Sequence, residues 1–365
     1  MSFKRWFVDM RVSFKLAAIG LSFSLPILVL LYFVINVKNH DINFSQWEFY
    51  GDDYQRVLER LLQHVPEHRL LAASLLSGNA GAREALAAKQ SQIDADFTAL
   101  AEVDRRLGGF LNTTPEELKK KDRDSLATMQ GEWGQLKAGV SGMPLEKADA
   151  DHVHLIADIR NLISHVGDAS NLILDPDLDT YYLMDVTLLA LPQTQDRLQE
   201  IVGFVRPLVA RGALSTEERV KLAVYAALLQ QSDVDRVKGS AGESLKEDAN
   251  FLGTSASLQS NLPPAVAEYA SANEALVALL EKLAASDAVA VGAAEVDAVG
   301  ARALATSFKL WDTSASELDK MLVRRVESTP ACGSRRSCSR SWRSSSRRCS
   351  CSSSASASRG PSARR

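Results

Sequence analysis

The chain has 365 residues, of which 46% are hydrophobic and 24% charged, and its formal net charge at pH 7 is −3. The last 34 residues contain nine Arg and no acid, so the rest of the chain holds 33 basic against 45 acidic side chains, a net charge of −12. This acidic body argues against nucleic acid as a partner. Because it lacks cysteine, it excludes disulfides, thiolate catalysis and cysteine-based zinc sites.

An apolar segment near the N-terminus predicts a membrane anchor. Residues 16–37 read LAAIGLSFSLPILVLLYFVINV and contain no charge. A helix of this length crosses a hydrocarbon core of about 30 Å, because each residue adds ~1.5 Å. The basic residues that precede it are Lys4, Arg5, Arg11 and Lys15. By the positive-inside rule, residues 1–15 are expected in the cytoplasm and the chain after residue 37 outside it.

A cleaved signal peptide is the alternative interpretation of this segment. The apolar core of a signal peptide is usually about 7–15 residues long and is followed by a cleavage site with small residues. Here the apolar run has 22 residues and ends at Ile35-Asn36-Val37-Lys38, which offers no such site. The sequence therefore favours an uncleaved, single-pass anchor.

Residues 38–328 carry a helical pattern throughout. Apolar residues recur every three or four positions, and two such stripes are Leu155, Ile159, Leu162, Val166 and Ile173, and Leu304, Phe308, Trp311, Leu318 and Leu322. We find no sustained two-residue alternation and no Asn-Gly or Asp-Gly hairpin turn, so no strand is expected. The predicted fold class is therefore all-α.

Helix start and stop signals divide this region into eight segments. Thr114-Pro115-Glu116-Glu117 and Ser215-Thr216-Glu217-Glu218 are capping boxes, and Gly- or Pro-containing stretches such as Leu262-Pro263-Pro264 mark other breaks. The predicted helices are 41–76, 81–110, 115–140, 146–174, 177–211, 216–252, 264–286 and 293–327. Eight antiparallel amphipathic helices fit an elongated extracytoplasmic structure of two four-helix bundles.

The C-terminal segment 329–365 differs in composition from everything before it. It contains at least a dozen Ser and all four cysteines of the chain: Cys332, Cys338, Cys349 and Cys351. GC-rich codons for Leu, Val and Ala become Cys, Ser, Trp and Arg codons when they are read one nucleotide late. A second membrane-spanning segment is therefore predicted to lie here out of frame, and the tail itself is expected to be disordered. The alternative is a genuine Arg/Ser-rich tail that binds nucleic acid or anionic lipid.

Two segments of the body resemble the exported sensor region of bacterial methyl-accepting chemotaxis receptors. They are residues 63–73, QHVPEHRLLAA, and residues 170–185, SNLILDPDLDTYYLMD, and the resemblance covers about residues 1–328. It implies a homodimeric receptor of a bacterial inner membrane. Its periplasmic helical domain, residues 38–328, would bind a small-molecule ligand and shift the transmembrane helices. An intact relative would pass this signal to a chemotaxis kinase complex.

The resemblance leaves the class of output domain open, because similar regions also stand in front of membrane diguanylate cyclases and sensor histidine kinases. We read no second span, linker domain or methylated hairpin in this chain, which is therefore expected to be truncated before its output domain. A further hypothesis is an anchored helical rod without a ligand. The sequence holds no catalytic triad or nucleotide-binding loop, so neither enzyme activity nor a cofactor is expected.

Arg69 is the first candidate ligand contact. The region bears a broader resemblance to helical nitrate-type sensors, which hold an anion with an arginine, and a guanidinium offers a rigid fork of donors to carboxylate or nitrate. His68 and Tyr182 complete the candidate set, Tyr182 because its hydroxyl can reach a ligand. Alternatively, Arg69 is an exposed or dimer-interface residue paired with Glu67 or another acid, and Tyr182 belongs to the core.

Acidic and histidine residues elsewhere predict no metal site. The alternating acids of residues 175–179 lack the Gly and the terminal Glu of an EF-hand loop, so capping of the following helix explains them. His152 and His154 are two residues apart on a helix and point in different directions, and His165 is about three turns from His154. We therefore expect these histidines not to share an ion.

Overall fold

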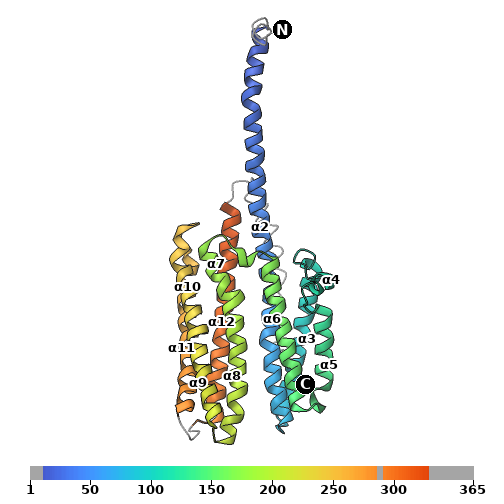
Figure 1. The fold of residues 1–365 in the computed structure, drawn as a ribbon, viewed down its shortest axis with the longest axis vertical. Coiled ribbons are helices and arrows are strands. Elements are labelled where there is room, and N and C mark those ends of the chain that lie inside the picture. The colour runs from blue at the N-terminus through green and yellow to red at the C-terminus, as the bar shows by residue number, and fades with distance from the viewer. Residues whose placement is uncertain (1–10, 286–290, 329–365) are drawn as a thin grey trace, which may run out of the picture. The chain divides into compact units, whose positions relative to one another are not determined.

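The computed structural model describes residues 11–285 and 291–328, and all regular elements within these ranges are helical (Figure 1). The predicted all-α class is therefore confirmed. The chain divides into two units, one formed by residues 1–43 and 325–365 and the other by residues 44–324. The predicted tail, residues 329–365, lies outside the described residues.

The described part of the first unit contains an apolar helix. Helix α2 (Val12–Leu76) begins here, and its segment Val12–Val37 has 26 residues, a mean hydropathy of 2.4 and no buried residue in its most apolar window. Pro26 lies within the segment without ending the helix. The segment is long and apolar enough to span a membrane, as predicted for residues 16–37.

The unit of residues 44–324 contains the remainder of α2 and, among its described residues, a series of further helices. The α-helices are α3 (Ala82–Leu107), α4 (Pro115–Lys119), α5 (Leu126–Gly139), α6 (Leu145–Ala169), α7 (Leu178–Met184), α8 (Leu191–Arg211), α9 (Thr216–Leu228), α10 (Asp235–Glu247), α11 (Ala256–Ala285) and α12 (Ala293–Ser328). Short 3-10 turns are η1 (Val140–Gly142), η2 (Leu172–Leu174) and η5 (Asp248–Asn250). The π-helical turns are η3 (Asp185–Ala190) and η4 (Leu229–Val234).

Both predicted capping boxes begin helices. The Ser215 hydroxyl accepts a hydrogen bond from the Glu218 amide, and the Glu218 carboxylate accepts one from the Ser215 amide. At α4 the Thr114 hydroxyl accepts from the Glu117 amide, with proline at the first helical position. These bonds satisfy amides that the first turn of a helix leaves without partners.

The predicted helix 115–140 is wrong, because the chain breaks after one turn. Helix α4 ends at Lys119, and a loop follows in which Asp122 has a φ of 51°. A second start signal then operates at Ser125, whose hydroxyl accepts from the Thr128 amide and caps α5. Ser125 is a residue type that often begins a helix, so the sequence does contain a start signal here. The acidic and basic residues before it are also typical of an exposed helix surface, and they therefore hide the break.

The predicted break at Pro263-Pro264 is also wrong. Helix α11 begins at Ala256 and runs through both prolines. An interior proline costs a helix roughly 3 kcal/mol. Leu258 and Leu262 are fully buried, and Ala265 is nearly so, on the face that continues across the prolines. Burial of each large apolar side chain contributes roughly 1.5–3 kcal/mol, so packing along the whole helix outweighs the local cost.

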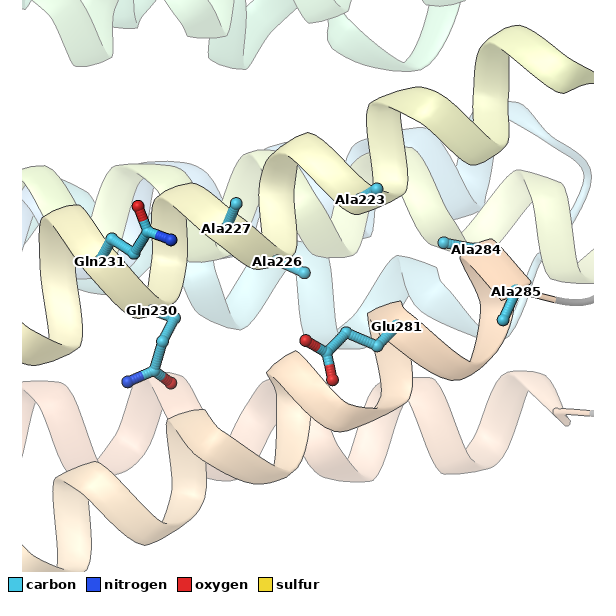
Figure 2. Close-up of a pocket in the computed structure, with 8 residues that line it drawn as sticks. All are labelled: Ala223, Ala226, Ala227, Gln230, Gln231, Glu281, Ala284 and Ala285. Atoms are coloured by element: carbon cyan, nitrogen blue, oxygen red, sulfur yellow. The ribbon is translucent and has the colours of Figure 1, made fainter.

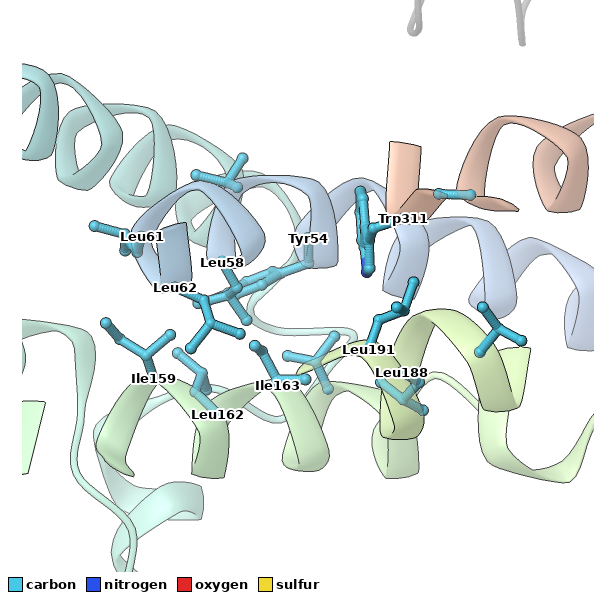
Figure 3. Packing of buried hydrophobic residues seen from close by; sticks show 14 of the residues in the cluster. Tyr54, Leu58, Leu61, Leu62, Ile159, Leu162, Ile163, Leu188, Leu191 and Trp311 are labelled. Carbon is cyan, nitrogen blue, oxygen red and sulfur yellow. The ribbon is translucent and has the colours of Figure 1, made fainter. Parts of the chain in front are cut away.

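Much of the core lies where α2 meets α6. Figure 3 shows Leu58 and Leu62 of α2 facing Ile159 and Leu162 of α6, and all four are at most 2% exposed. Further along, Trp311 of α12 donates a 2.8 Å hydrogen bond from its indole nitrogen to the Thr187 carbonyl.

The apolar core connects the early and the late helices of this unit. The largest cluster includes residues of α2, α3, α5 and α6 together with residues of α10, α11 and α12. A second cluster joins α8, α9, α11 and α12. The arrangement as two four-helix bundles stays a prediction.

A glycine permits close packing of α6 against the π-helical turn η3. A Cβ atom on Gly167 would overlap the Leu188 side chain, which is itself buried. Glycine is therefore required here by the approach of the two elements rather than by backbone conformation.

Candidate functional site

His68 belongs to a chain of hydrogen bonds across the interior between α2, α3 and α6. Its Nδ1 lies 2.7 Å from Nε2 of His152, and its Nε2 lies 3.3 Å from the side-chain nitrogen of Gln90. His152 Nδ1 lies 2.5 Å from the carbonyl oxygen of Ala148. The Trp133 ring meets His68 edge to face, with centroids 5.0 Å apart.

The partners fix which ring nitrogens carry protons. A carbonyl only accepts, so His152 donates from Nδ1 and, when neutral, accepts at Nε2. His68 must then donate from Nδ1 and accept at Nε2, where the Gln90 amide donates. Every ring nitrogen of the pair therefore has a partner of the correct kind with both rings neutral.

Burial keeps both imidazoles neutral at pH 7. It lowers the pKa of His68 to about 3, with a further contribution from His152, and lowers the pKa of His152 to about 4. The Ala148 carbonyl opposes the second shift because it favours the protonated ring. The hydrogen bonds of this pair are structural, and they leave no ring nitrogen available to bind a ligand.

Arg69 follows His68 in sequence but lies at the surface. Its Nε and Nη2 donate to the two oxygens of Asp149 at 2.6 and 3.0 Å, a bidentate pair between α2 and α6. The side chains are 22% and 45% exposed. Glu67, the first acid considered as a partner, instead pairs with Lys89 at 2.5 Å. The structure thus matches the alternative in which Arg69 is paired, with Asp149 as the acid.

Tyr182 is not brought to His68 and Arg69. It is half-buried on α7 and packs edge to face on the exposed Tyr181, with ring centroids 5.5 Å apart. Among the described residues no hydrogen bond or ring contact joins it to either α2 residue. Figure 1 places α7 at one end of the residue 44–324 unit and the C-terminal end of α2 at the other. Met184, on the same helix, is buried.

The acids of residues 175–179 lie at the start of α7, but the structure shows a turn held by Asp175 in place of the expected side-chain cap. Asp175 Oδ1 accepts from the Asp177 amide at 3.0 Å and from the Thr180 hydroxyl at 2.8 Å. The N-cap itself is Asp177. The side chain of Asp175 thereby folds the turn that precedes the helix.

The histidines of α6 face different surroundings, as their spacing predicts. His152 is fully buried, whereas the His154 side chain is 60% exposed and lies near Glu132 and Asp158. His165 is buried in a third place, where its Nε2 lies 2.9 Å from the Asn112 carbonyl oxygen.

A buried carboxylic acid connects α2 to α8. The Gln195 amide nitrogen donates to Glu59 Oε1 at 2.6 Å, and Glu59 is 6% exposed. Burial raises the pKa of Glu59 to about 8, the Gln195 hydrogen bond opposes this shift, and Asp312 reinforces it. Glu59 is therefore mainly protonated at pH 7.

Each π-helical turn carries an aspartate that pairs with an arginine of another helix. Asp185 of η3 accepts from Arg236 at 2.6 Å and from Ser240 at 2.7 Å. Asp233 of η4, which is 1% exposed, accepts from Arg197 of α8 at 2.5 Å. A π turn inserts one residue into the helix and so changes where the following side chains point, a feature that often occurs at functional sites.

Several polar atoms in this interior have no hydrogen-bond partner within the described residues. They are the side-chain oxygens Oε1 of Gln195, Oε1 of Gln199, Oδ1 of Asp233 and Oδ1 of Asn273. An unpaired buried acceptor costs roughly 1–3 kcal/mol, so water molecules are expected to occupy this region.

The sequence reasoning did not identify Glu59 or Asp233. The only signal in the local sequence is an acidic residue at a position where helical spacing places core residues. Glu59, which lies between Leu58 and Leu62, is such a residue. Helical periodicity treats such an acid as an interruption, because its partner lies far along the chain.

A groove lies between α9, η4 and the end of α11. Figure 2 shows that small side chains line it, with Gln230, Gln231 and Glu281 as its polar members. Its volume is about 430 Å³. The predicted site residues do not line this groove.

Comparison of the chain with protein-family models, with curated proteins and with solved structures found no match.

Proposed function

We propose that this chain is a membrane-anchored sensor of a small ligand, with residues 38–328 outside the cytoplasm. The observation that carries the proposal is the segment Val12–Val37, whose length and mean hydropathy of 2.4 suit a bilayer. Water would be an unfavourable surrounding for so many exposed apolar side chains, since each CH₂ group favours an apolar environment by roughly 0.8 kcal/mol. The basic residues before the segment support a cytoplasmic N-terminus in a bacterial inner membrane.

Helix α2 supports a route for the signal. The same helix contains the apolar segment and, further along, Glu59, His68 and Arg69. A ligand that changes the contacts of Arg69 would act on the helix that enters the membrane. Shifts of one helix by an ångström or two are a common form of receptor switching.

The pair of Arg69 and Asp149 is the proposed ligand contact. An ion pair that is partly exposed contributes only about 0–1 kcal/mol, so a ligand can replace it at low cost. A carboxylate or nitrate would take the place of Asp149 on the guanidinium. A zwitterion would engage both partners, its carboxylate on Arg69 and its ammonium on Asp149.

The finer features of the proposal rest on the resemblance of residues 63–73 and 170–185 to chemotaxis receptors. They are a homodimer and signalling to a kinase complex by an intact relative that retains a second span and an output domain. The two periplasmic four-helix bundles rest instead on the helical periodicity of residues 38–328. Resequencing the gene near codon 330 and translating the corrected frame would distinguish a methylated coiled coil from a cyclase or kinase domain.

A ligand screen on the detergent-solubilised full chain tests sensing. Thermal melting is recorded with amino acids, organic acids and nitrate. A ligand at ~100 times its dissociation constant should raise stability by about 2.7 kcal/mol. If no compound shifts melting while the chain still dimerises, the ligand-free rod replaces the sensor.

Reporter fusions test the orientation independently. Alkaline phosphatase fused after residue 200 should be active, because this enzyme matures only outside the cytoplasm. An inactive fusion, together with an active cytoplasmic reporter at the same position, would reject the proposed topology.

A further inference from the structure

Four side chains with metal-binding chemistry converge where α5 packs beside α6. This α5–α6 cluster consists of Asp124, Glu132, His154 and Asp158, and one ligand atom from each lies within 4.8 Å of all the others. Asp124 comes from the loop before α5, Glu132 from α5, and the other two from α6. His154 and Asp158 are four residues apart and so share one face of their helix.

Two separations in the α5–α6 cluster match those between ligands of one ion. His154 Nε2 lies 3.4 Å from Glu132 Oε1 and 3.7 Å from Asp158 Oδ2. Bonds of about 2.0–2.2 Å to a tetrahedral ion place its ligands roughly 3.3–3.6 Å apart. The distances from His154 to these two carboxylate oxygens are therefore already close to those that a shared ion would impose.

Asp158 is buried without a hydrogen bond at the oxygen that faces the cluster. The residue is 8% exposed, and its Oδ2 has no hydrogen-bond partner within the described residues. Oε2 of Glu132 is likewise buried and unpartnered. A buried carboxylate oxygen without a donor is unfavourable, so a cation at this point would compensate for its desolvation.

The α5–α6 cluster carries an excess of negative charge. Its three carboxylates lie near one imidazole, and within the described residues no lysine or arginine forms an ion pair with any of the four. A divalent cation would leave a net charge of −1 in place of −3.

We propose that the α5–α6 cluster binds one divalent transition-metal ion of the Zn²⁺ type. One imidazole nitrogen and three carboxylate oxygens form a donor set that suits Zn²⁺, whereas Ca²⁺ takes six to eight oxygen ligands. The 60% exposed His154 side chain gives the ion access from solvent. This site is separate from the Arg69–Asp149 pair and does not depend on the sensor function.

The ion would join three pieces of backbone. It would hold the loop between Lys119 and Leu126 to both α5 and α6, at the place where the chain leaves regular helix. Binding is therefore expected to raise the melting temperature as well as to release heat.

Calorimetric titration of the full chain with ZnCl₂ tests the proposal. The protein is stripped with a chelator, held in detergent at pH 7.5, and carries serine at positions 332, 338, 349 and 351 in every sample so that no thiol competes. One ion per chain should bind with a dissociation constant below about 10 µM. His154→Gln and Asp158→Asn should each weaken binding at least tenfold.

Asp151→Asn is the matched control, because Asp151 lies on the same helix and pairs only at the surface with Lys147 at 2.9 Å. It should change the affinity for Zn²⁺ by less than twofold. His154→Gln alters an exposed residue, so its effect is interpretable even if Asp158→Asn unfolds. Unchanged Zn²⁺ binding in His154→Gln, the absence of binding in the parent chain, or Ca²⁺ binding as tight as Zn²⁺ would overturn the proposal.

Discussion

Among the arginine–aspartate pairs that connect helices in the residue 44–324 unit, Arg69–Asp149 and Arg197–Asp233 differ in burial. Arg69 and Asp149 are 22% and 45% exposed, whereas Arg197 and Asp233 are 17% and 1% exposed. The first pair can exchange its partner for water or a ligand at little cost. The second cannot, because the buried Asp233 would lose Arg197, the ion-pair partner that it has among the described residues. Exchange of the partner is therefore expected to cost little at the first pair and much at the second.

The buried polar groups near the two pairs also differ, because one set is fully hydrogen-bonded and the other is not. Around His68 and His152 every ring nitrogen is hydrogen-bonded with both rings neutral. Around Glu59 and Asp233 a carboxylic acid and a carboxylate are buried next to acceptors without partners. The two interiors should therefore respond in opposite directions to a change of pH.

Removing the arginine from each pair gives the largest expected difference. Arg197→Met leaves Asp233 buried and unpaired, which should cost about 3–5 kcal/mol of unfolding free energy. Arg69→Met leaves a partly exposed Asp149 and should cost less than about 1 kcal/mol. Urea unfolding at pH 7 measures both, and equal losses would contradict the distinction between the pairs.

Cutting the histidine chain should cost slightly less. His152→Ala removes a buried ring and leaves the Nδ1–H of His68 unpaired, for an expected loss of about 3–4 kcal/mol. His154→Ala, two residues along the same helix, removes a 60% exposed side chain and should cost less than about 0.5 kcal/mol. A similar loss in both variants would show that the buried network has no special role.

Glu59 should make the free energy of unfolding fall as pH rises, and Glu59→Gln should remove this pH dependence. The folded pKa of Glu59, about 8, lies above the ordinary value of 4.5. Its contribution is therefore fully present below pH 4.5 and disappears as pH rises through 8. Between pH 5 and pH 8 the parent chain should lose about 3 kcal/mol more than the variant. Identical pH profiles in urea unfolding would mean that Glu59 is ionised in the fold.

The pair of His68 and His152 should make the free energy of unfolding fall as pH falls, the opposite of Glu59. The pKa values of His68 and His152, about 3 and about 4, lie below the ordinary 6.5. Between these folded and ordinary pKa values the unfolded chain binds more protons than the folded chain. The free energy of unfolding therefore falls as pH falls from 6.5. In the Glu59→Gln background, acidification from pH 7 to pH 5.5 should cost about 2 kcal/mol. The same step in a Glu59→Gln, His152→Ala double variant should cost about half as much.

The sequence predicts the helices of this fold well where capping and periodicity are strong. The starts at Pro115 and Thr216 and the apolar helix near the N-terminus are read directly from residues. The break between Lys119 and Leu126 and the continuous helix through Pro263 were missed. In the first case polar residues imitate a helix surface, and in the second packing outweighs proline.

The interior networks and the α5–α6 cluster could not be predicted in this way. His68 meets His152 across 84 positions of sequence, so no local pattern joins them. The expectation of no metal site rested on the acids of residues 175–179 and on histidines along a single helix. The α5–α6 cluster instead depends on a loop position, Asp124, and on Glu132 of the neighbouring helix. Such partners become visible only when the packing of two helices is known.

The most direct test of the sensor proposal compares two ion pairs that α2 makes with its neighbours. For a compound that stabilises the parent chain, melting is repeated in Arg69→Ala and in Lys89→Ala, which breaks the equivalent pair with Glu67. If Arg69 holds the ligand, the stabilising shift disappears in Arg69→Ala and persists in Lys89→Ala. A shift of full size in Arg69→Ala would contradict this role of Arg69.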